Sequence, residues 1–459
     1  MSQNIEAELR QIGKQHMETE VPQNLHEYVQ KGLDKRPSAK NARLPLRVCA
    51  TILTVLAMFT ATIRLSPAFA QAVSTIPGLE YIVDLIYPDS SLMLAHEMGY
   101  TQPVGEKNTM DGISISVDGI MADESGYVIF YTVENNSPYK YISIEYVQIK
   151  NEGLDYSLSH EQILSDSKIS NGKINCILRD KTEMPESLDI IFSLSAGDSL
   201  NTFGDGLNNL LPPDSTMEIT ANIDKGIFLG DKKEYKLAEE FTIDQQRIFF
   251  DTLTVYPTRA ELKIYFDESN TMEVFDFENL HLKDEKGNSY KLTEDHLSKS
   301  RLPNENSVLY TFQSNYLFDC RELYICADGI RALDKDDLYV KVKPKTGEIL
   351  NSNINGLSFD YFGTDPDNYN GAKKSRNVLS FWISTDKVRH YTVFDSFVYD
   401  ENRDILFEAQ GTGTIVAADK SKLQAYIYFS EDESIDEIIY LKLIDYPNVI
   451  ASDMTIKAK

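Results

Sequence analysis

The feature that most constrains this chain is an apolar stretch from Val48 to Ile63, VCATILTVLAMFTATI, which contains no charge, amide or proline. Arg47 and Arg64 bound it. A helix rises about 1.5 Å per residue, so this stretch would cover roughly 24 Å of the ~30 Å hydrocarbon core of a bilayer. Because arginine side chains can extend toward the headgroups, a span over residues 46–66 is feasible. The sequence therefore predicts one transmembrane helix.

The charges on either side of this stretch predict its orientation. Between Lys31 and Arg47 there are six basic residues and one acid, whereas Leu65 to Glu106 holds no Lys or Arg. Cytoplasmic flanks of membrane spans are enriched in Lys and Arg. We therefore expect a single-pass protein of the plasma membrane, with its N-terminus in the cytoplasm and its C-terminal region outside the cell.

A cleaved signal peptide is the alternative, since Ala68-Phe69-Ala70 matches the small-residue pattern of a cleavage site. The polar arm before the apolar stretch is far longer than an ordinary signal-peptide n-region. A retained anchor is therefore the preferred interpretation.

Net charge limits the ligands of the exterior region. The whole chain of 459 residues carries −26. Residues 1–47 carry eight basic and six acidic residues, a net of +2, and Arg64 adds one positive charge, so the remainder carries −29. Phosphate backbones require a basic surface, so nucleic acid is not an expected partner.

The N-terminal arm, residues 1–45, has two apolar patches at helical spacing. Short amphipathic helices bury little surface by themselves, so the arm is either a loosely ordered tail or a segment that docks on a partner. We predict docking on a cytosolic protein through the residues Ile5, Leu9, Ile12, Leu25, Tyr28, Val29 and Leu33.

Residues 67–98 are predicted to form juxtamembrane helices. Pro77-Gly78 interrupts the pattern, and Leu79, Ile82, Val83 and Ile86 then share one helical face before Pro88. We expect these helices to lie on the membrane surface or against the base of the exterior domain.

From about Tyr100 the hydrophobic period changes to two, as in β-strands. Strand-like segments recur with Gly, Asn, Asp and Pro turns between them, which predicts a mainly β region of tandem antiparallel immunoglobulin-like β-sandwich modules. The alternation predicts that the following residues face cores: Ile113, Ile115, Val117, Leu262, Ile264, Phe266, Leu423, Ala425 and Ile427.

A weak internal similarity suggests where the modules begin. Residues 112–134 resemble residues 247–269, each being strand, polar turn and strand, and a third pair follows at 356–362 and 378–384. Repeated units of this kind indicate modules. We predict β-sandwich domains at 99–240, 241–347 and 348–459.

No catalytic or metal-binding motif stands out. The exterior histidines are scattered, and no H-E-x-x-H, G-x-S-x-G or P-loop pattern occurs. In GTDPDNYNG (363–371), Asp365 and Asp367 alternate as in a calcium loop, but Tyr369 stands where a third ligand is needed. A polar loop is expected there, with a cation site as the alternative. We predict no enzyme activity, no cofactor and no metal.

Four cysteines are present, at positions 49, 176, 320 and 326. Cys320 and Cys326 share one strand-like segment, which would separate them by ~20 Å, too far for a disulfide. Buried free thiols are the expected state, with a disulfide framework or metal site as the alternative.

Three segments together resemble a known family. They are VPQNLHEYVQKGL (21–33), LSPAFAQAVSTIPGL (65–79) and GISISVDGIMADESGYVIFYTVEN (112–135). They are similar to the Gram-positive bacterial family called domain of unknown function 4179, over roughly residues 20–140. Its members are single-span proteins, often treated as anti-sigma-factor-like regulators. Residues 241–350 resemble the immunoglobulin-like domain that often accompanies it. The resemblance implies a role in envelope signalling. The C-x-x-C/His zinc signature of one anti-sigma class is absent, so that mechanism is not implied.

Two functions from different classes follow. The first is a transmembrane regulator whose arm binds a sigma factor while the exterior modules act as a sensor. The alternative is an anchored surface binding or structural protein that holds a cell-wall polymer or another protein outside, with an inert arm. An anchored hydrolase is a third, less favoured, hypothesis.

The topology makes a first testable prediction. Protease added to intact cells should degrade the region after Ala70 and leave a tag at residue 1 intact, because the positive-inside rule places the arm in the cytoplasm. Immunoblots against the tag and the C-terminus measure this. A soluble mature protein that begins at Gln71 would support the signal-peptide alternative instead.

Overall fold

The computed structural model describes residues 80–459 apart from short gaps. The gaps are positions 88, 152, 162, 229, 231, 434 and 436 and the segments 180–183, 201–206, 295–296, 303–306, 352–353, 365–375, 386–391, 418–420 and 431–432. The predicted arm and span, and most of the loop 363–371, lie outside the described residues. Within the part that is described, no helix is both long and apolar enough to cross a membrane.

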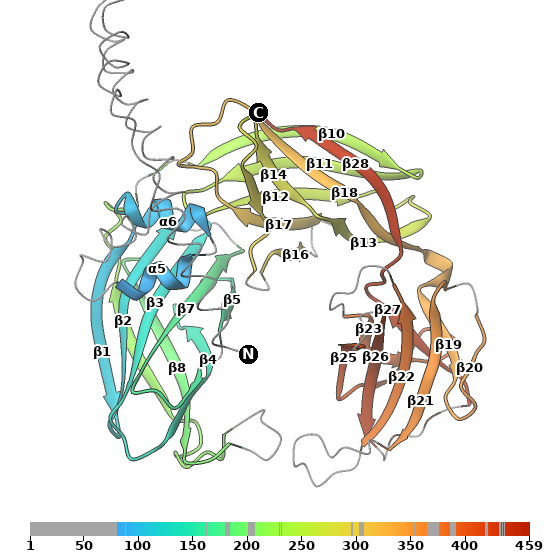
Figure 1. Ribbon diagram of the computed structural model, residues 1–459, viewed down its shortest axis with the longest axis horizontal. Coiled ribbons are helices and arrows are strands. Elements are labelled where there is room, and N and C mark those ends of the chain that lie inside the picture. Colours follow the sequence, from blue (N-terminus) through green and yellow to red (C-terminus); the bar gives the residue numbers. More distant parts are fainter. Residues whose placement is uncertain are drawn as a thin grey trace, which may run out of the picture. The chain divides into compact units, whose positions relative to one another are not determined.

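The described residues belong to one compact unit, Ala72–Lys459, and are mainly β, with several antiparallel sheets, as predicted (Figure 1). The strands form three modules. In each module two sheets contribute to one hydrophobic core. We call them module 1, module 2 and module 3.

Module 1 contains the sheets β1-β2-β3-β7-β5 and β6-β4-β8-β9. Their strands are β1 (Gln102–Met110), β2 (Ile113–Asp123), β3 (Gly126–Asn135), β4 (Tyr141–Ile149), β5 (Tyr156–His160), β6 (Leu164–Ser165), β7 (Ile169–Leu178), β8 (Ser187–Gly197) and β9 (Thr216–Asn222). Tyr131 of the first sheet and Phe192 of the second meet in the core, with ring centroids 5.2 Å apart.

Module 2 contains the sheet β10-β11-β12-β17-β16 and a second sheet in which β18 pairs with β13, β14 and β28. The strands are β10 (Lys233–Ile243), β11 (Gln246–Val255), β12 (Arg259–Phe266), β13 (Met272–Glu278), β14 (His281–Asp284), β15 (Ser289–Lys291), β16 (Lys299–Leu302), β17 (Ser307–Gln313), β18 (Leu323–Asp334) and β28 (Val449–Lys457).

Module 3 contains the sheets β20-β19-β27-β23-β24 and β21-β22-β26-β25. A short 3-10 helix, η1 (Lys335–Asp337), precedes it. The strands are β19 (Tyr339–Lys343), β20 (Glu348–Ile349), β21 (Leu357–Thr364), β22 (Arg376–Ser384), β23 (Phe394–Tyr399), β24 (Ile405–Glu408), β25 (Gly411–Val416), β26 (Lys422–Ser430) and β27 (Ile439–Leu443).

Two short helices cover one face of module 1. In α5 (Glu80–Ile86), which the sequence predicted, Ile82 and Ile86 are fully buried. They pack with Met121, Val128 and Phe130 of β2 and β3. The helix α6 (Ser90–Glu97) was not predicted as a separate element. Asp89 caps it by accepting hydrogen bonds from the backbone N–H groups of Ser91 and Leu92.

Period-two alternation predicted the cores correctly. Ile113, Ile115 and Val117 are fully buried in module 1. The same holds for all the other residues predicted to face cores except Phe266, which is half-buried and packs against the core of module 2. The similar segments are β2–β3, β11–β12 and β21–β22, and each is an antiparallel pair within one sheet of its module.

The structure differs from the predicted boundaries of the third module at both ends. Pro344 to Gly347, at the predicted boundary between 347 and 348, is the turn between β19 and β20. β28, inside the predicted range 348–459, pairs with β18 of module 2. β10 also begins at Lys233, before the predicted boundary at 240.

The two differences in the third module have one cause, which is that modules 2 and 3 exchange their last strands. In module 1, β8 lies between β4 and the strand that follows it, β9. In module 2, β18 corresponds to β8, and β28 pairs with it instead of β19, the next strand along the chain. In module 3, β27 corresponds to β8, and β19 pairs with it instead of β28. The chain therefore crosses between the two modules twice, after β18 and after β27.

Buried charges and apolar side chains hold the two crossings together. The Arg331 side chain on β18 is only 4% exposed and pairs with Glu278 of β13 at 2.7 Å and with Asp445 of the second crossing at 2.9 Å. Burial alone would lower the pKa of Arg331, but hydrogen bonds to Asp445 raise it above its ordinary value. Phe275 and Leu333 of module 2 belong to the core of module 3.

The exchange makes a prediction about Gly329. Its φ is +142°, and a Cβ there would collide with the carbonyl oxygen of Ile450 on β28. Gly329→Ala should therefore lower the free energy of unfolding by about 2–4 kcal/mol, because both backbone strain and separation of β28 oppose the folded state.

Thermal unfolding followed by circular dichroism measures this, with Gly287→Ala as the matched control. Gly287 also has a positive φ, +84°, but has nothing within 4 Å of its Cβ position. The control should lose only about 1 kcal/mol. Equal losses would contradict the close approach of β28 to β18.

Candidate functional site

Modules 1 and 2 meet where their equivalent hairpin turns come together. Asp123, at the end of β2, is buried and accepts hydrogen bonds through Oδ2 from Thr258 N at 2.8 Å and Thr258 Oγ1 at 2.6 Å. Its Oδ1 accepts from the N–H and hydroxyl groups of Ser125. Every oxygen of this buried carboxylate is therefore satisfied by neutral donors, two of them from the other module.

A second contact at the same junction is exposed. Lys232 Nζ lies 2.8 Å from Glu124 Oε2, and the side chains are 38% and 52% exposed. Such pairs contribute little to stability because water and salt screen them. Asp123 is therefore the contact that positions the two modules at this point.

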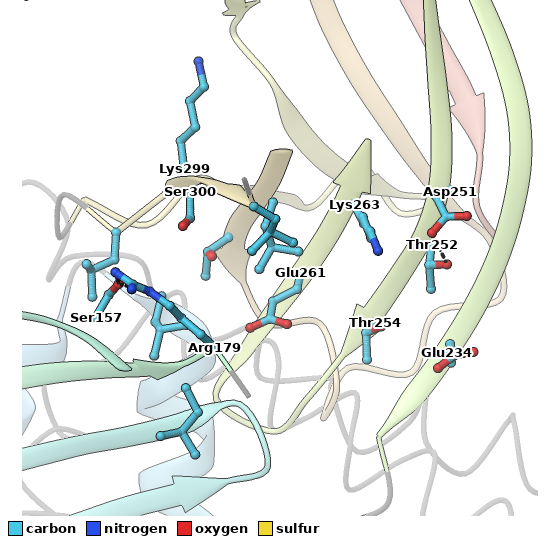
Figure 2. A pocket seen from close by; sticks show the side chains of 16 residues that line it. Ser157, Arg179, Glu234, Asp251, Thr252, Thr254, Glu261, Lys263, Lys299 and Ser300 are labelled. Atoms are coloured by element: carbon cyan, nitrogen blue, oxygen red, sulfur yellow. Dashed lines mark hydrogen bonds between the residues drawn. The ribbon is translucent and has the colours of Figure 1, made fainter. Parts of the chain in front are cut away.

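A pocket of about 480 Å³ opens beside the junction (Figure 2). Its floor is the outer face of the first sheet of module 2. Leu253 and Leu262 face the core, so alternation places Thr252, Thr254 and Glu261 outward. Thr254 lies opposite Glu261, and Thr252 lies opposite Lys263.

Module 1 contributes the other wall. Arg179 donates to Ser157 Oγ at 2.9 and 3.1 Å and pairs with Asp155 at 3.4 Å, so its guanidinium is held on module 1. Lys299 lines the pocket only with its stem, since its ammonium points away in Figure 2 and lies 3.5 Å from Asp276. Burial lowers the pKa of Lys299.

A neighbouring pocket of about 490 Å³ is lined by three parts of the chain at once. The helices provide Leu85, Asp89 and Leu92, module 1 provides Lys173 and Asn175, and module 2 provides Thr258 and Arg259. Lys173 Nζ donates to the carbonyl oxygen of Leu85 at 3.2 Å, which ties α5 to β7. A ligand in this pocket would contact the segment that leads toward the predicted span.

Both pockets have mixed polar and apolar linings. Carboxylates, hydroxyls and a few cations line them. Among the described residues no group of three or more His, Cys, Asp or Glu side chains could hold a metal ion. His160, which the sequence left without a role, lines the second pocket.

The predicted partner-binding residues and the pocket residues are different sets. Ile5, Leu9, Ile12, Leu25, Tyr28, Val29 and Leu33 all lie outside the described residues, so the docking prediction stays open. Cys176, Cys320 and Cys326 are free thiols. Burial raises the pKa of Cys176 to about 12, which makes it unreactive at neutral pH.

Sequence reasoning missed the junction because Asp123 and Thr258 lie in turns 135 residues apart. The internal similarity was the one signal available, since it aligned the turn after β2 with the turn after β11. Nothing in it indicated that the two turns touch.

Comparisons with known proteins support the resemblance in part. Residues 40–135 match a family described as a domain of unknown function, DUF4179, and residues 232–364 match a family of unknown function, DUF5643. No curated protein matches the chain. A crystal structure of a conserved domain protein from Bacillus anthracis is similar at a TM-score of 0.37 with 13% identity, covering 55% of this chain and 84% of that one. A likeness at this level carries no argument about function.

The junction makes a testable prediction. Asp123→Ala leaves the buried N–H and hydroxyl groups of Thr258 and Ser125 without their acceptor, so it should cost about 2–4 kcal/mol of unfolding free energy. Urea unfolding of the full-length protein measures the loss.

Glu124→Ala is the control, since it removes a neighbouring carboxylate from the same junction. Its pair with Lys232 is exposed, so the loss should stay below about 1 kcal/mol. Similar losses in the two variants would contradict the role assigned to Asp123.

Proposed function

We propose that this chain is a membrane-anchored sensor and regulator of the bacterial cell envelope, similar to anti-sigma factors. Its arm binds a sigma factor in the cytoplasm, and its exterior modules, immunoglobulin-like in character, respond to a ligand outside. The match of residues 40–135 to the DUF4179 family supports this, because that stretch includes the predicted span.

The observation that carries the proposal is the pocket lined by the helices and both modules. The helices α5 and α6 follow the predicted span and are fixed on module 1 through Ile82, Ile86 and Leu92. A ligand that binds at the junction would favour one arrangement of module 2 against these helices. The difference between the binding free energies of the ligand for two arrangements of module 2 is the free energy available for signalling.

The arm needs both of its apolar patches to hold a partner. The face formed by Leu25, Tyr28, Val29 and Leu33 could bury several hundred Å², worth on the order of 5 kcal/mol gross. Ordering the arm and losing free motion consume much of this. The patch of Ile5, Leu9 and Ile12 would supply the second contact.

The second candidate function is an anchored surface binding protein without a regulatory arm. The double crossing between modules 2 and 3 favours it, because two covalent connections and a shared core make a stiff unit suited to displaying a binding surface. The two candidates differ in what the arm does, and that difference can be tested.

A pull-down with residues 1–47 from native cytosol should capture a sigma factor. Leu25→Asp with Val29→Asp should abolish capture, because two carboxylates cannot enter an apolar interface without losing hydration. Mass spectrometry of the captured proteins measures both results.

The matched control is Gln23→Asp with Gln30→Asp, which adds the same charge outside the apolar stripe and should retain capture. If no arm captures a sigma factor, and deleting the arm leaves transcription unchanged, the regulator proposal fails and the surface-binding function takes its place.

A further inference from the structure

The pocket of about 490 Å³ between the helices and modules 1 and 2 contains a buried cation without a counter-ion. Arg259 is the first residue of β12, lines this pocket and is only 4% exposed. Ala260 and Leu262 are fully buried in the core, so alternation places Arg259 on the outer face of the sheet. Among the residues that the structure describes, its side chain makes one hydrogen bond, from Nε to Thr258 Oγ1 at 3.3 Å, and no ion pair.

The other buried arginine of the fold shows what Arg259 lacks. The Arg331 side chain is also 4% exposed, but it pairs with Glu278 and Asp445. Removing a charge from water opposes folding unless an opposite charge and hydrogen bonds compensate for the lost hydration. A guanidinium has five donors in a planar fork, and Arg259 uses one of them on the protein. Unused donors on a buried cation are the arrangement expected of a site that receives an anion.

The buried carboxylate of Asp123 does not pair with Arg259. Its two oxygens accept from the N–H and hydroxyl groups of Thr258 and Ser125, which are neutral. Thr258 Oγ1 connects the two charged groups, because it accepts from Arg259 and donates to Asp123 Oδ2 at 2.6 Å. Arg259 is therefore linked by hydrogen bonds to the contact that positions modules 1 and 2, while its charge stays without a partner.

The three acids of the pocket lining leave this charge in place. Asp89 is occupied as the cap of α6. Burial raises the pKa of Asp89, and backbone hydrogen bonds and the charge of Lys173 oppose that rise. Glu161 and Glu294 are exposed, so water and salt screen their charges. Arg259 is thus the buried charge that a ligand could neutralise.

Other groups of the lining show what else the ligand would contact. Cys176 is buried in the core, so alternation places its neighbour Asn175 on the outer face of β7. Asn175 is 9% exposed, and within the described part of the chain its side-chain amide has no hydrogen-bond partner. The buried Thr293 hydroxyl also has none among the described residues. Leu85 of α5 and Leu92 of α6 add apolar surface.

We propose that this pocket binds a small monocarboxylate, with its carboxylate on Arg259 and its apolar body against the two helices. The planar guanidinium fork matches a carboxylate with two parallel hydrogen bonds. The volume of about 490 Å³ lies in the range of small-molecule sites. Glu161 and Glu294 in the same lining would repel a polyanion, so a single charge is favoured. The effect of the ligand on the helices rests on the proposed function, whereas the binding chemistry does not.

Calorimetric titration of the full-length protein in a non-ionic detergent tests the ligand class. The probes are butyrate and benzoate, with butyramide and benzamide as uncharged amides of the same shape. At least one acid should bind, and its amide should bind at least about tenfold more weakly, because it lacks the charge that strengthens hydrogen bonds to a guanidinium. Inorganic phosphate, which is largely doubly charged at neutral pH, should also bind more weakly than the acid.

Two matched variants separate binding from folding. Arg259→Met keeps an apolar stem and removes the guanidinium, so it should weaken binding of the acid at least about tenfold. It should not lower the melting temperature of the ligand-free protein, because the charge it removes is buried without a counter-ion. Arg331→Met removes an equally buried guanidinium that is paired, so it should lower the melting temperature by several degrees and retain binding.

A third variant keeps the test independent of Arg259. Asn175→Ala removes an amide without a protein partner, so it should fold as the native protein does and weaken binding of the acid about fivefold. Four results would overturn the proposal: no binding of either acid, equal binding of an amide or of phosphate, unchanged binding by the Arg259 variant, and equal losses of stability in the Arg259 and Arg331 variants. None of them affects capture of a sigma factor by the arm, so the two proposals can fail separately.

Discussion

The buried guanidinium of Arg331 is the interaction on which the arrangement of modules 2 and 3 depends. It forms two parallel hydrogen bonds to Asp445, each 2.9 Å long, and one of 2.7 Å to Glu278. Asp276 lies 3.3 Å away and also accepts from the hydroxyl of Tyr310. Desolvating such a cluster offsets much of its attraction, so its contribution to stability is modest. Breaking it costs about 3–5 kcal/mol, because the remaining charges stay buried.

What the cluster specifies is which strand closes which sheet. Any strand beside β18, whether β28 or β19, must alternate apolar and polar residues in the same way. The apolar pattern alone therefore does not determine which of the two pairs with β18. Asp445 does, because it lies on the connection between β27 and β28 and can reach Arg331 only if the chain returns to module 2. Phe275 and Leu333 of module 2 then enter the core of module 3 at the crossing. Bending at the crossing between modules 2 and 3 would expose both the buried charges and the apolar surface to water.

The sequence predicted which residues of a strand are buried, because this depends on alternation within the strand. It could not predict which strands pair with each other. Ile113, Leu262 and Leu423 are buried as expected because alternation fixes their face whichever strand lies beside them. The strand exchange was invisible, since Pro344 to Gly347 has the composition of a linker and a hairpin turn alike. Arg331 sits in an ordinary strand and its partners are 53 and 114 residues away.

The two junctions differ in a way that matters for the proposed sensor. Modules 2 and 3 share two connections, a buried charge cluster and part of a core, whereas modules 1 and 2 are joined by one connection and meet at Asp123 and Thr258. A force applied to module 3 by a ligand would therefore pass through module 2 with little distortion. It would act on the junction between modules 1 and 2, where the hydrogen bonds of Asp123 and the exposed Lys232–Glu124 pair resist it. That junction adjoins Asp89 and Leu92, so it lies next to the helices that lead toward the predicted span. Under the proposed function, modules 2 and 3 move together as one stiff unit. Binding outside the cell therefore changes the arrangement of the helices at the junction between modules 1 and 2.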